Sequence, residues 1–174
     1  MEDKERDSLG KLSFDVRMKT AYLFDFLFQH SYHGLYGVFN FGLSLLAVVL
    51  LVRGSGKDNI VAMVALVMLA LLFTVINPLL LYRKAARQMK RTPAFQKPLT
   101  YELMEEGLAC SQEGERVVSE WENVVLIRET RISLILYFGA ANAVVLPKAE
   151  FPGQVGEVKE MLRRKCPDLA KKLK

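Results

Sequence analysis

The strongest constraint on this chain is a pair of long uncharged runs separated by a short polar turn. Residues 34–52 contain no charged side chain over 19 positions, and residues 60–82 contain none over 23. A helix needs roughly 20 apolar residues to cross the hydrocarbon core of a bilayer. The seven residues between the runs, RGSGKDN, are typical of a turn. The sequence therefore predicts two transmembrane helices joined as a hairpin.

Two alternative roles for these runs are less favoured. Buried helices of a soluble protein would need covering elements, and a chain of 174 residues has few left to supply them. A cleaved signal peptide is disfavoured because about thirty charged and mixed residues precede the first run, and no small-residue cleavage site follows it.

The net charge of +5 comes from one short segment directly after the second run. Residues 1–33 carry a net charge of −1, the 53–59 loop carries +1, and residues 92–174 carry equal numbers of both signs. The segment 83–91 holds five basic residues and no acidic one: Arg83, Lys84, Arg87, Lys90 and Arg91. Such a cluster beside a membrane span marks the cytoplasmic side and contacts anionic lipid of the inner leaflet.

The two runs and these charges predict a multi-pass membrane protein with both termini in the cytoplasm and a short external loop. Nucleic-acid binding is disfavoured because it requires a free basic face with interleaved aromatic residues. Cys110 and Cys166 both fall on the predicted cytoplasmic side, where thiols stay reduced, so no disulfide is expected.

The chain divides into four parts. Residues 1–11 are highly charged and predicted to be disordered. Residues 12–33 begin with a strand-like alternation and continue as an aromatic helix suited to the headgroup interface or to packing on a domain. Residues 34–91 hold the hairpin and its basic extension. Residues 92–174 form a separate domain, and the sequence leaves open whether the 12–18 strand joins it.

The last part of the chain is predicted to contain several antiparallel strands followed by one helix. The segments LTYELMEEGLACSQ, VVSEWENVVLIRET, RISLILYFG and ANAVVLPKAEF carry strand-like alternation, with turns between them. Val155, Val158 and Leu162 then recur at helical spacing before Pro167. The predicted fold class is α+β, in which a transmembrane hairpin precedes a small antiparallel β barrel capped by a C-terminal helix.

This arrangement resembles the YcxB-like family of bacterial membrane proteins. The resemblance covers residues 12 to 165, in segments such as KPLTYELMEEGL, SEWENV and LYFGAANAVVLPKAEF. It implies two spans and a cytosolic pleckstrin-homology-like (PH-like) domain, and it implies no known activity. The matching positions are Thr100, Tyr101, Gly107, Trp121, Glu129, Tyr137, Pro147, Lys148 and Phe151.

No pattern in the sequence points to catalysis, a cofactor or a metal. His30 and His33 are the only histidines, and with Asp25 they fall short of a metal site. The GSGK stretch in the 53–59 loop lacks the leading glycine of a phosphate-binding loop. We therefore expect a protein that is not an enzyme.

Three further groups of residues are candidates for function. Asn77 and Pro78 place a polar group and a kink inside the second span. Glu105, Glu113 and Glu115 belong to an acidic segment that is a candidate docking face. Trp121 is either part of the core or an exposed anchor for a partner, and the sequence leaves this open.

The resulting hypothesis is a membrane protein that presents a domain for protein interaction or regulation. Its predicted partners are anionic lipids and an unknown protein, which would dock on an open strand edge or on the acidic face. An alternative is an oligomeric membrane conduit, because two spans per chain enclose a pathway only in a homo-oligomer.

Overall fold

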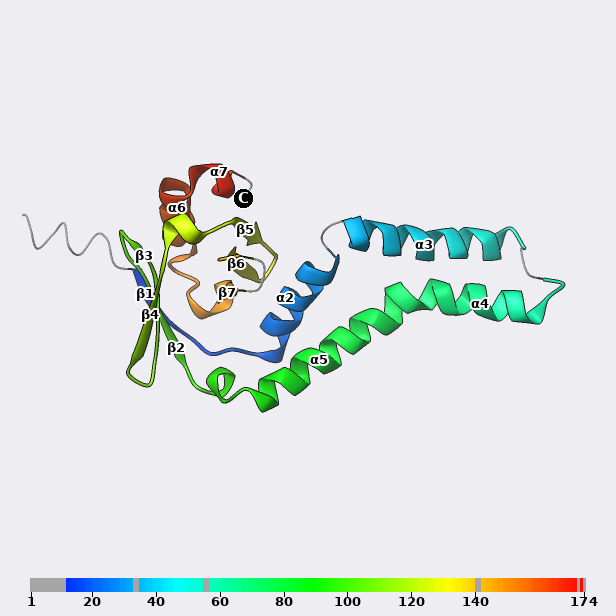
Figure 1. The fold of residues 1–174 in the computed structure, drawn as a ribbon, viewed down its shortest axis with the longest axis horizontal. Helices are drawn as coiled ribbons and strands as arrows, with labels where there is room; N and C mark the ends of the chain where they lie inside the picture. The colour runs from blue at the N-terminus through cyan, green and yellow to red at the C-terminus, as the bar shows by residue number, and fades with distance from the viewer. Residues whose placement is uncertain (1–11, 33–34, 55–56, 140–141, 172, 174) are drawn as a thin grey trace, which may run out of the picture. The chain divides into compact units, whose positions relative to one another are not determined.

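The computed structural model describes residues 12–32, 35–54, 57–139, 142–171 and 173. The chain forms two compact units, residues 1–25 with 89–174 and residues 26–88. We call the first the β domain and the second the helical unit, and describe each by itself (Figure 1). The predicted disorder of residues 1–11 lies outside the described part of the chain.

The β domain contains two antiparallel sheets. The first has the order β1-β2-β3-β4 and the second the order β5-β6-β7. The first sheet consists of β1 (Leu12–Val16), β2 (Leu99–Leu103), β3 (Gly107–Gln112) and β4 (Glu115–Glu120). The second consists of β5 (Leu126–Glu129), β6 (Ser133–Tyr137) and β7 (Ala143–Pro147).

The N-terminal strand β1 joins the β domain, which the sequence had left open. β1 pairs with β2 in a register that sets Phe14 opposite Tyr101. The Phe14 ring stacks on Phe151 with ring centroids 4.2 Å apart, and both side chains are buried. The β domain is therefore discontinuous in sequence, and the helical unit is inserted between its first and second strands.

The α+β class and the antiparallel sheets are confirmed, but the sheets do not close into the predicted barrel. The short 3-10 helix Trp121–Asn123 interrupts the chain between β4 and β5, so no ladder joins these two strands. Helix α6 (Val155–Lys165) packs Val158, Met161 and Leu162 into the core that the sheets share. It ends before Pro167, where the short α7 (Pro167–Ala170) begins.

Trp121 belongs to the core. Its side chain is 7% exposed, and its indole N–H donates a hydrogen bond to the Met104 carbonyl oxygen at 2.9 Å. Leu103, Leu134 and Leu146 are fully buried in the same cluster. An exposed anchor at Trp121 is therefore excluded.

The first turns of α2 (Thr20–Tyr32) belong to the β domain and are attached by polar contacts. Lys19 Nζ and the Tyr22 hydroxyl donate to Glu150 Oε1 at 2.6 and 2.8 Å. One helical turn later, Asp25 Oδ2 accepts a hydrogen bond from Thr130 Oγ1 at 2.7 Å. These contacts fix the start of α2 to loops of the second sheet.

In the helical unit, α3 (Leu35–Val52) and α4 (Ile60–Leu71) pack along each other. Asn59 caps α4 by accepting hydrogen bonds from the backbone N–H groups of Val61 and Ala62. The contact between the helices uses small side chains, since Ser44 and Ala47 are 1% exposed and Ser44 Oγ donates to the Leu69 carbonyl at 3.1 Å. Small residues allow close approach of two helix backbones.

A π-helical turn, Leu72–Ile76, separates α4 from α5 (Asn77–Arg91). With this turn included, residues 60–91 form one helix of 32 residues that is long and apolar enough to cross a membrane. A second span would require α2 and α3 to act as one segment, and these two helices are bent by 81° at their junction. The structure thus holds one or two helices that could cross a membrane.

Candidate interaction site at the free edge of β4

Strand β4 is one of the two outer strands of its sheet and the most exposed strand of the β domain. It follows β3 through a two-residue turn in which Glu113 and Gly114 have φ values of 52° and 88°. Positive φ at both central positions matches the twist of antiparallel strands and gives a tight hairpin. β4 therefore lies in a fixed register on β3, with Cys110 opposite Val117.

At this edge the backbone of β4 presents hydrogen-bonding groups that no other described strand uses. The Ser119 carbonyl points toward β3, because a Cβ atom on Gly107 would lie 2.4 Å from its oxygen. Backbone groups alternate in direction along a strand, so those of Arg116, Val118 and Glu120 point away from β3. An edge of this kind can pair with another strand.

The side chains of β4 leave apolar surface in solvent. Val117 is 64% exposed although it lies on the core-facing side of the sheet, in line with Cys110, Tyr101 and Phe14. Val118, on the opposite side, is 45% exposed. Both faces of β4 therefore carry apolar surface that the described part of the domain does not cover.

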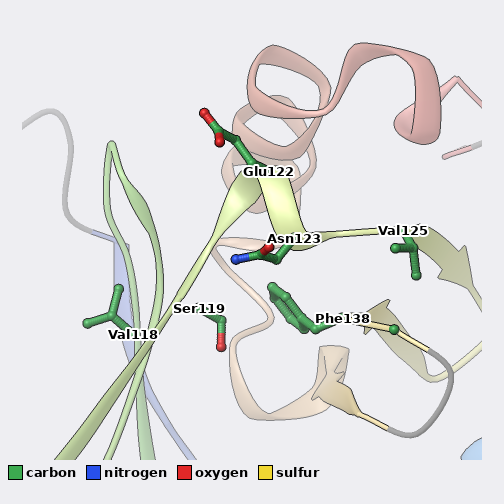
Figure 2. A pocket seen from close by; sticks show the side chains of 7 residues that line it. Val118, Ser119, Glu122, Asn123, Val125 and Phe138 are labelled. Atoms are coloured by element: carbon green, nitrogen blue, oxygen red, sulfur yellow. The ribbon is translucent and has the colours of Figure 1, made fainter.

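A groove of about 490 Å³ lies between the end of β4 and the second sheet. Figure 2 shows the Phe138 ring beside the side chains of Ser119 and Asn123, whereas Val118 points away on the other side of the strand. The residues that line the groove are Val118, Ser119, Glu122, Asn123, Val125, Phe138 and Gly139. Apolar side chains such as Phe138 and polar ones such as Asn123 share this lining, so the groove offers both apolar and hydrogen-bonding contacts.

The charged residues of β4 are arranged around Val118. Arg116 Nη2 donates to Glu102 Oε2 of β2 at 2.7 Å, and the Arg116 side chain remains 49% exposed. Within the described part of the chain, no ion pair engages Glu115 or Glu120. The free edge thus presents a cation, an apolar side chain and an anion in succession.

The three glutamates of the proposed acidic docking face lie at two different ends of β3. Glu105 is in the β2–β3 turn and pairs with Lys165 and Arg164 of α6, and the Lys165 ammonium lowers the pKa of the Glu105 carboxyl. Glu113 pairs with Lys97 in the β3–β4 turn, beside Glu115. The structure therefore brings Glu113 and Glu115 together and places Glu105 apart from them.

The five cations of the topology cluster all lie on α5 and are all exposed, while Ala85 on the same helix is buried. At 3.6 residues per turn, they fall within about one third of the helix circumference. Such a face concentrates positive charge in one direction. The residues of the cluster are Arg83, Lys84, Arg87, Lys90 and Arg91.

The Asn77–Pro78 pair follows the π-helical turn and belongs to a small polar network. Asn77 Nδ2 donates to the Tyr32 hydroxyl at 3.1 Å, and that hydroxyl donates to the Phe73 carbonyl oxygen at 2.6 Å. The polar groups of this network satisfy one another within the helical unit.

The histidines and cysteines of the sequence are also candidates for metal ligands or nucleophiles. Among the residues that the structure describes, no three His, Cys, Asp or Glu side chains gather as metal ligands. His33 is not among the described residues. Burial raises the pKa of both Cys110 and Cys166, which disfavours the nucleophilic thiolate.

Sequence reasoning missed two arrangements. One is the groove beside β4, although Val117 and Val118 side by side on a predicted strand already place one valine on each face. The other is a partly buried cluster in which Glu129 Oε1 accepts from Lys148 and Lys159, each at 2.6 Å. Glu129 and Lys148 are both positions of the family resemblance, but only the fold brings Lys159 of α6 to them.

Comparison with known proteins agrees with the resemblance seen in the sequence. Residues 103–162 match the model of the family described as YcxB-like protein. The matched segment runs from the end of β2 into α6 and so includes β4 and the groove. No curated protein matches the chain.

Proposed function

We propose that this YcxB-like chain is a non-catalytic integral membrane protein whose β domain, a PH-like domain, binds a protein partner at the cytoplasmic face of the membrane. The observation that carries the proposal is the free edge of β4, where unused backbone groups, Val117 and the groove lie together. Protein interaction is the function that such an edge supports best.

Membrane insertion is supported by the outward faces of the helices. Large apolar side chains face outward along α3, α4 and the start of α5, with exposures from 38% to 82%. A water-soluble protein rarely leaves such a continuous apolar surface uncovered. The side chains that the helical unit buries are instead small ones, such as Ser44, Ala47 and Ala70, as is typical of helix contacts in lipid.

The orientation of the protein is inferred from charge. The cationic face of α5 follows the apolar stretch of the 60–91 helix, and clustered Lys and Arg near the end of a span favour the cytoplasmic side. The same face would contact anionic headgroups, at about 1 kcal/mol per cation near the surface. The proposal therefore places the β domain in the cytoplasm of a bacterial cell.

The alternative, an oligomeric membrane conduit, rests on the polar network of Tyr32 and Asn77 beside the π-helical turn. Polar groups in a span can line a pathway when several chains assemble. In this chain the groups are already bonded to one another, so interaction through the β domain has the better support.

Site-specific photo-crosslinking in native membranes tests the function. We expect Val117→p-benzoylphenylalanine to give a covalent adduct with another polypeptide chain, identified by mass spectrometry. The matched control carries the same group at Glu157, an exposed residue of α6. Absence of an adduct above this control, together with recovery of a large homo-oligomer in mild detergent, would replace the interaction function by the conduit.

A further inference from the structure

We infer that the partner of the β4 edge is a second copy of this chain, paired antiparallel about a two-fold axis at Val118. This inference rests on the proposed interaction function and names its partner. It follows from the backbone direction, the side-chain pattern and the charges of β4.

The backbone sets the register. The groups of Arg116, Val118 and Glu120 point to the free side of β4, so a strand added there forms its hydrogen bonds with these three residues. Suppose that the added strand is the β4 of a second copy and that the two strands form one continuous antiparallel sheet. A two-fold axis at Val118 then sets the three outward-pointing residues of one strand opposite the three of the other. Val118 then lies opposite Val118 of the second copy, and Arg116 lies opposite Glu120.

The side chains are self-complementary in this register. Val118 is apolar and half-exposed, and valine opposite valine is a favourable cross-strand pair. The two-fold axis creates two Arg116–Glu120 pairs, and Glu120 is engaged by no ion pair in the described part of the chain. A symmetric interface needs this property, in which one residue contacts a second and the second contacts the first.

The other face of the strand also gains cover. Val117 lies on the core-facing side, where the same register sets it opposite Ser119 of the second copy. The 64% exposed Val117 side chain would thereby be shielded from water. The Arg116 guanidinium bonds Glu102 through one nitrogen and has further N–H donors for Glu120 of the second copy.

Neighbouring registers are less favourable. An axis at Val117 would set Arg116 opposite Val118 and would leave Glu120 beyond the end of the paired strand. An axis at Ser119 would set Val118 opposite Glu120. Only the Val118 axis pairs both charges with opposite charges and the central apolar residue with itself, and cross-strand pairs of each kind contribute roughly 0.2 to 1 kcal/mol.

A charge-swap experiment on the full chain in neutral detergent micelles tests the inference. Molecular mass is measured by light scattering after size exclusion, with correction for bound detergent. We expect a dimer for the wild type. Each of Arg116→Glu and Glu120→Arg turns two attractive pairs into two repulsive ones and should weaken the dimer about tenfold or more. The double variant restores opposite charges and should restore the dimer.

Two controls separate association from folding. Glu102→Gln removes the intramolecular partner of Arg116 and should leave the dimer intact. Trp121 fluorescence reports the buried core and should be the same in all variants.

A second measurement uses Val118→Cys, which should form an intermolecular disulfide under mild oxidation, because opposing hydrogen-bonded residues place their Cα atoms about 5.5 Å apart. Glu157→Cys is its matched control.

A monomeric wild type, single variants that stay dimeric, or a folded double variant that stays monomeric would each overturn the inference. Photo-crosslinking at Val117 separates a failure of this inference from a failure of the proposed function. If the photo-crosslinker at Val117 captures a different protein, the edge remains an interaction site and only the identity of the partner changes. If it captures nothing, both proposals fall.

Discussion

The Tyr32 hydroxyl donates a hydrogen bond to the Phe73 carbonyl oxygen at 2.6 Å. The π-helical turn explains why this carbonyl needs a donor from another helix. In that turn the Asn77 N–H reaches back five residues to the Leu72 carbonyl. The next residue, Pro78, has no N–H, so the carbonyl of Phe73 loses the donor that the same spacing would give it. Tyr32 supplies the missing donor.

Replacing Tyr32 by Phe should therefore destabilise the helical unit. The change leaves the Phe73 carbonyl without a hydrogen bond in an apolar surrounding, at a cost of about 1 kcal/mol. The expected result is a lower Tm in detergent micelles, measured by circular dichroism. Thr74→Ala is a suitable control, because its hydroxyl bonds only the Ala70 carbonyl of its own helix.

A double-mutant cycle makes this prediction sharper. Pro78→Ala introduces an N–H that can reach the Phe73 carbonyl, so the cost of Tyr32→Phe should shrink in the Pro78→Ala background. Equal costs in both backgrounds would show that the cost comes from the other hydrogen bond of this hydroxyl, which it accepts from Asn77 Nδ2, rather than from the bond to Phe73.

The discontinuity of the β domain predicts how it can be isolated. Residues 89–174 alone lack β1 and should not unfold cooperatively, whereas residues 12–25 joined to them by a flexible linker should form a soluble, cooperative domain. Urea unfolding followed by Trp121 fluorescence distinguishes the two. Phe14→Ala in the linked domain should cost about 3–5 kcal/mol, as expected for a buried aromatic ring. A stable 89–174 fragment would contradict the role assigned to β1.

Two buried hydroxyls in neighbouring positions should respond differently to removal. Thr130 Oγ1 donates to Asp25 and accepts from the backbone N–H of Ser133, so Thr130→Val should cost about 1–3 kcal/mol. Ser133 Oγ is buried and has no hydrogen-bond partner within the described part of the chain, so Ser133→Ala should change stability by less than about 0.5 kcal/mol. Chemical unfolding of both variants measures the difference, and comparable losses would disprove the assignment.

The Glu150 carboxylate should make the stability of the β domain depend on pH. Hydrogen bonds from Lys19 and Tyr22 lower its pKa below the ordinary value of 4.5. The folded state therefore binds this proton less readily, and the stabilisation is present above pH 4.5 and is lost as the pH falls through the lower folded pKa.

Glu150→Gln should thus be less stable than the wild type at pH 7, and the difference in the free energy of unfolding should shrink as the pH falls below 4.5. Denaturation at several pH values measures this. Glu157→Gln is a matched control, since Glu157 is exposed and forms no ion pair in the described part of the chain. A difference that stays constant with pH would point to packing instead.

The cationic face of α5 should determine the orientation in the membrane. A cysteine at Asp58, in the loop between α3 and α4, should react with an impermeant maleimide added to intact spheroplasts, while Cys110 and Cys166 should not. Replacing Arg83, Lys84, Arg87, Lys90 and Arg91 by Gln should reduce this labelling as a fraction of molecules inverts. Unchanged labelling would mean that the cluster does not set the topology.

Composition and local spacing were sufficient to predict several features of this protein. Two uncharged runs indicated the long apolar helices, the strand-like segments after residue 99 indicated antiparallel strands, and Pro167 marked the end of α6. The family resemblance was also visible in the sequence, and it was confirmed over residues 103–162. These features are local because hydrophobic period and turn residues act over only a few positions.

Features that join distant segments became visible only in the folded chain. The pairing of β1 with β2 spans the whole helical unit, and the strand-like alternation of residues 12–16 does not say which strand it will meet. The exposure of Val117 depends on which segments pack over its side of the sheet, and the need for Tyr32 depends on the register of a helix elsewhere in the chain. Burial and hydrogen bonding between remote residues are set by packing, which a local pattern does not encode.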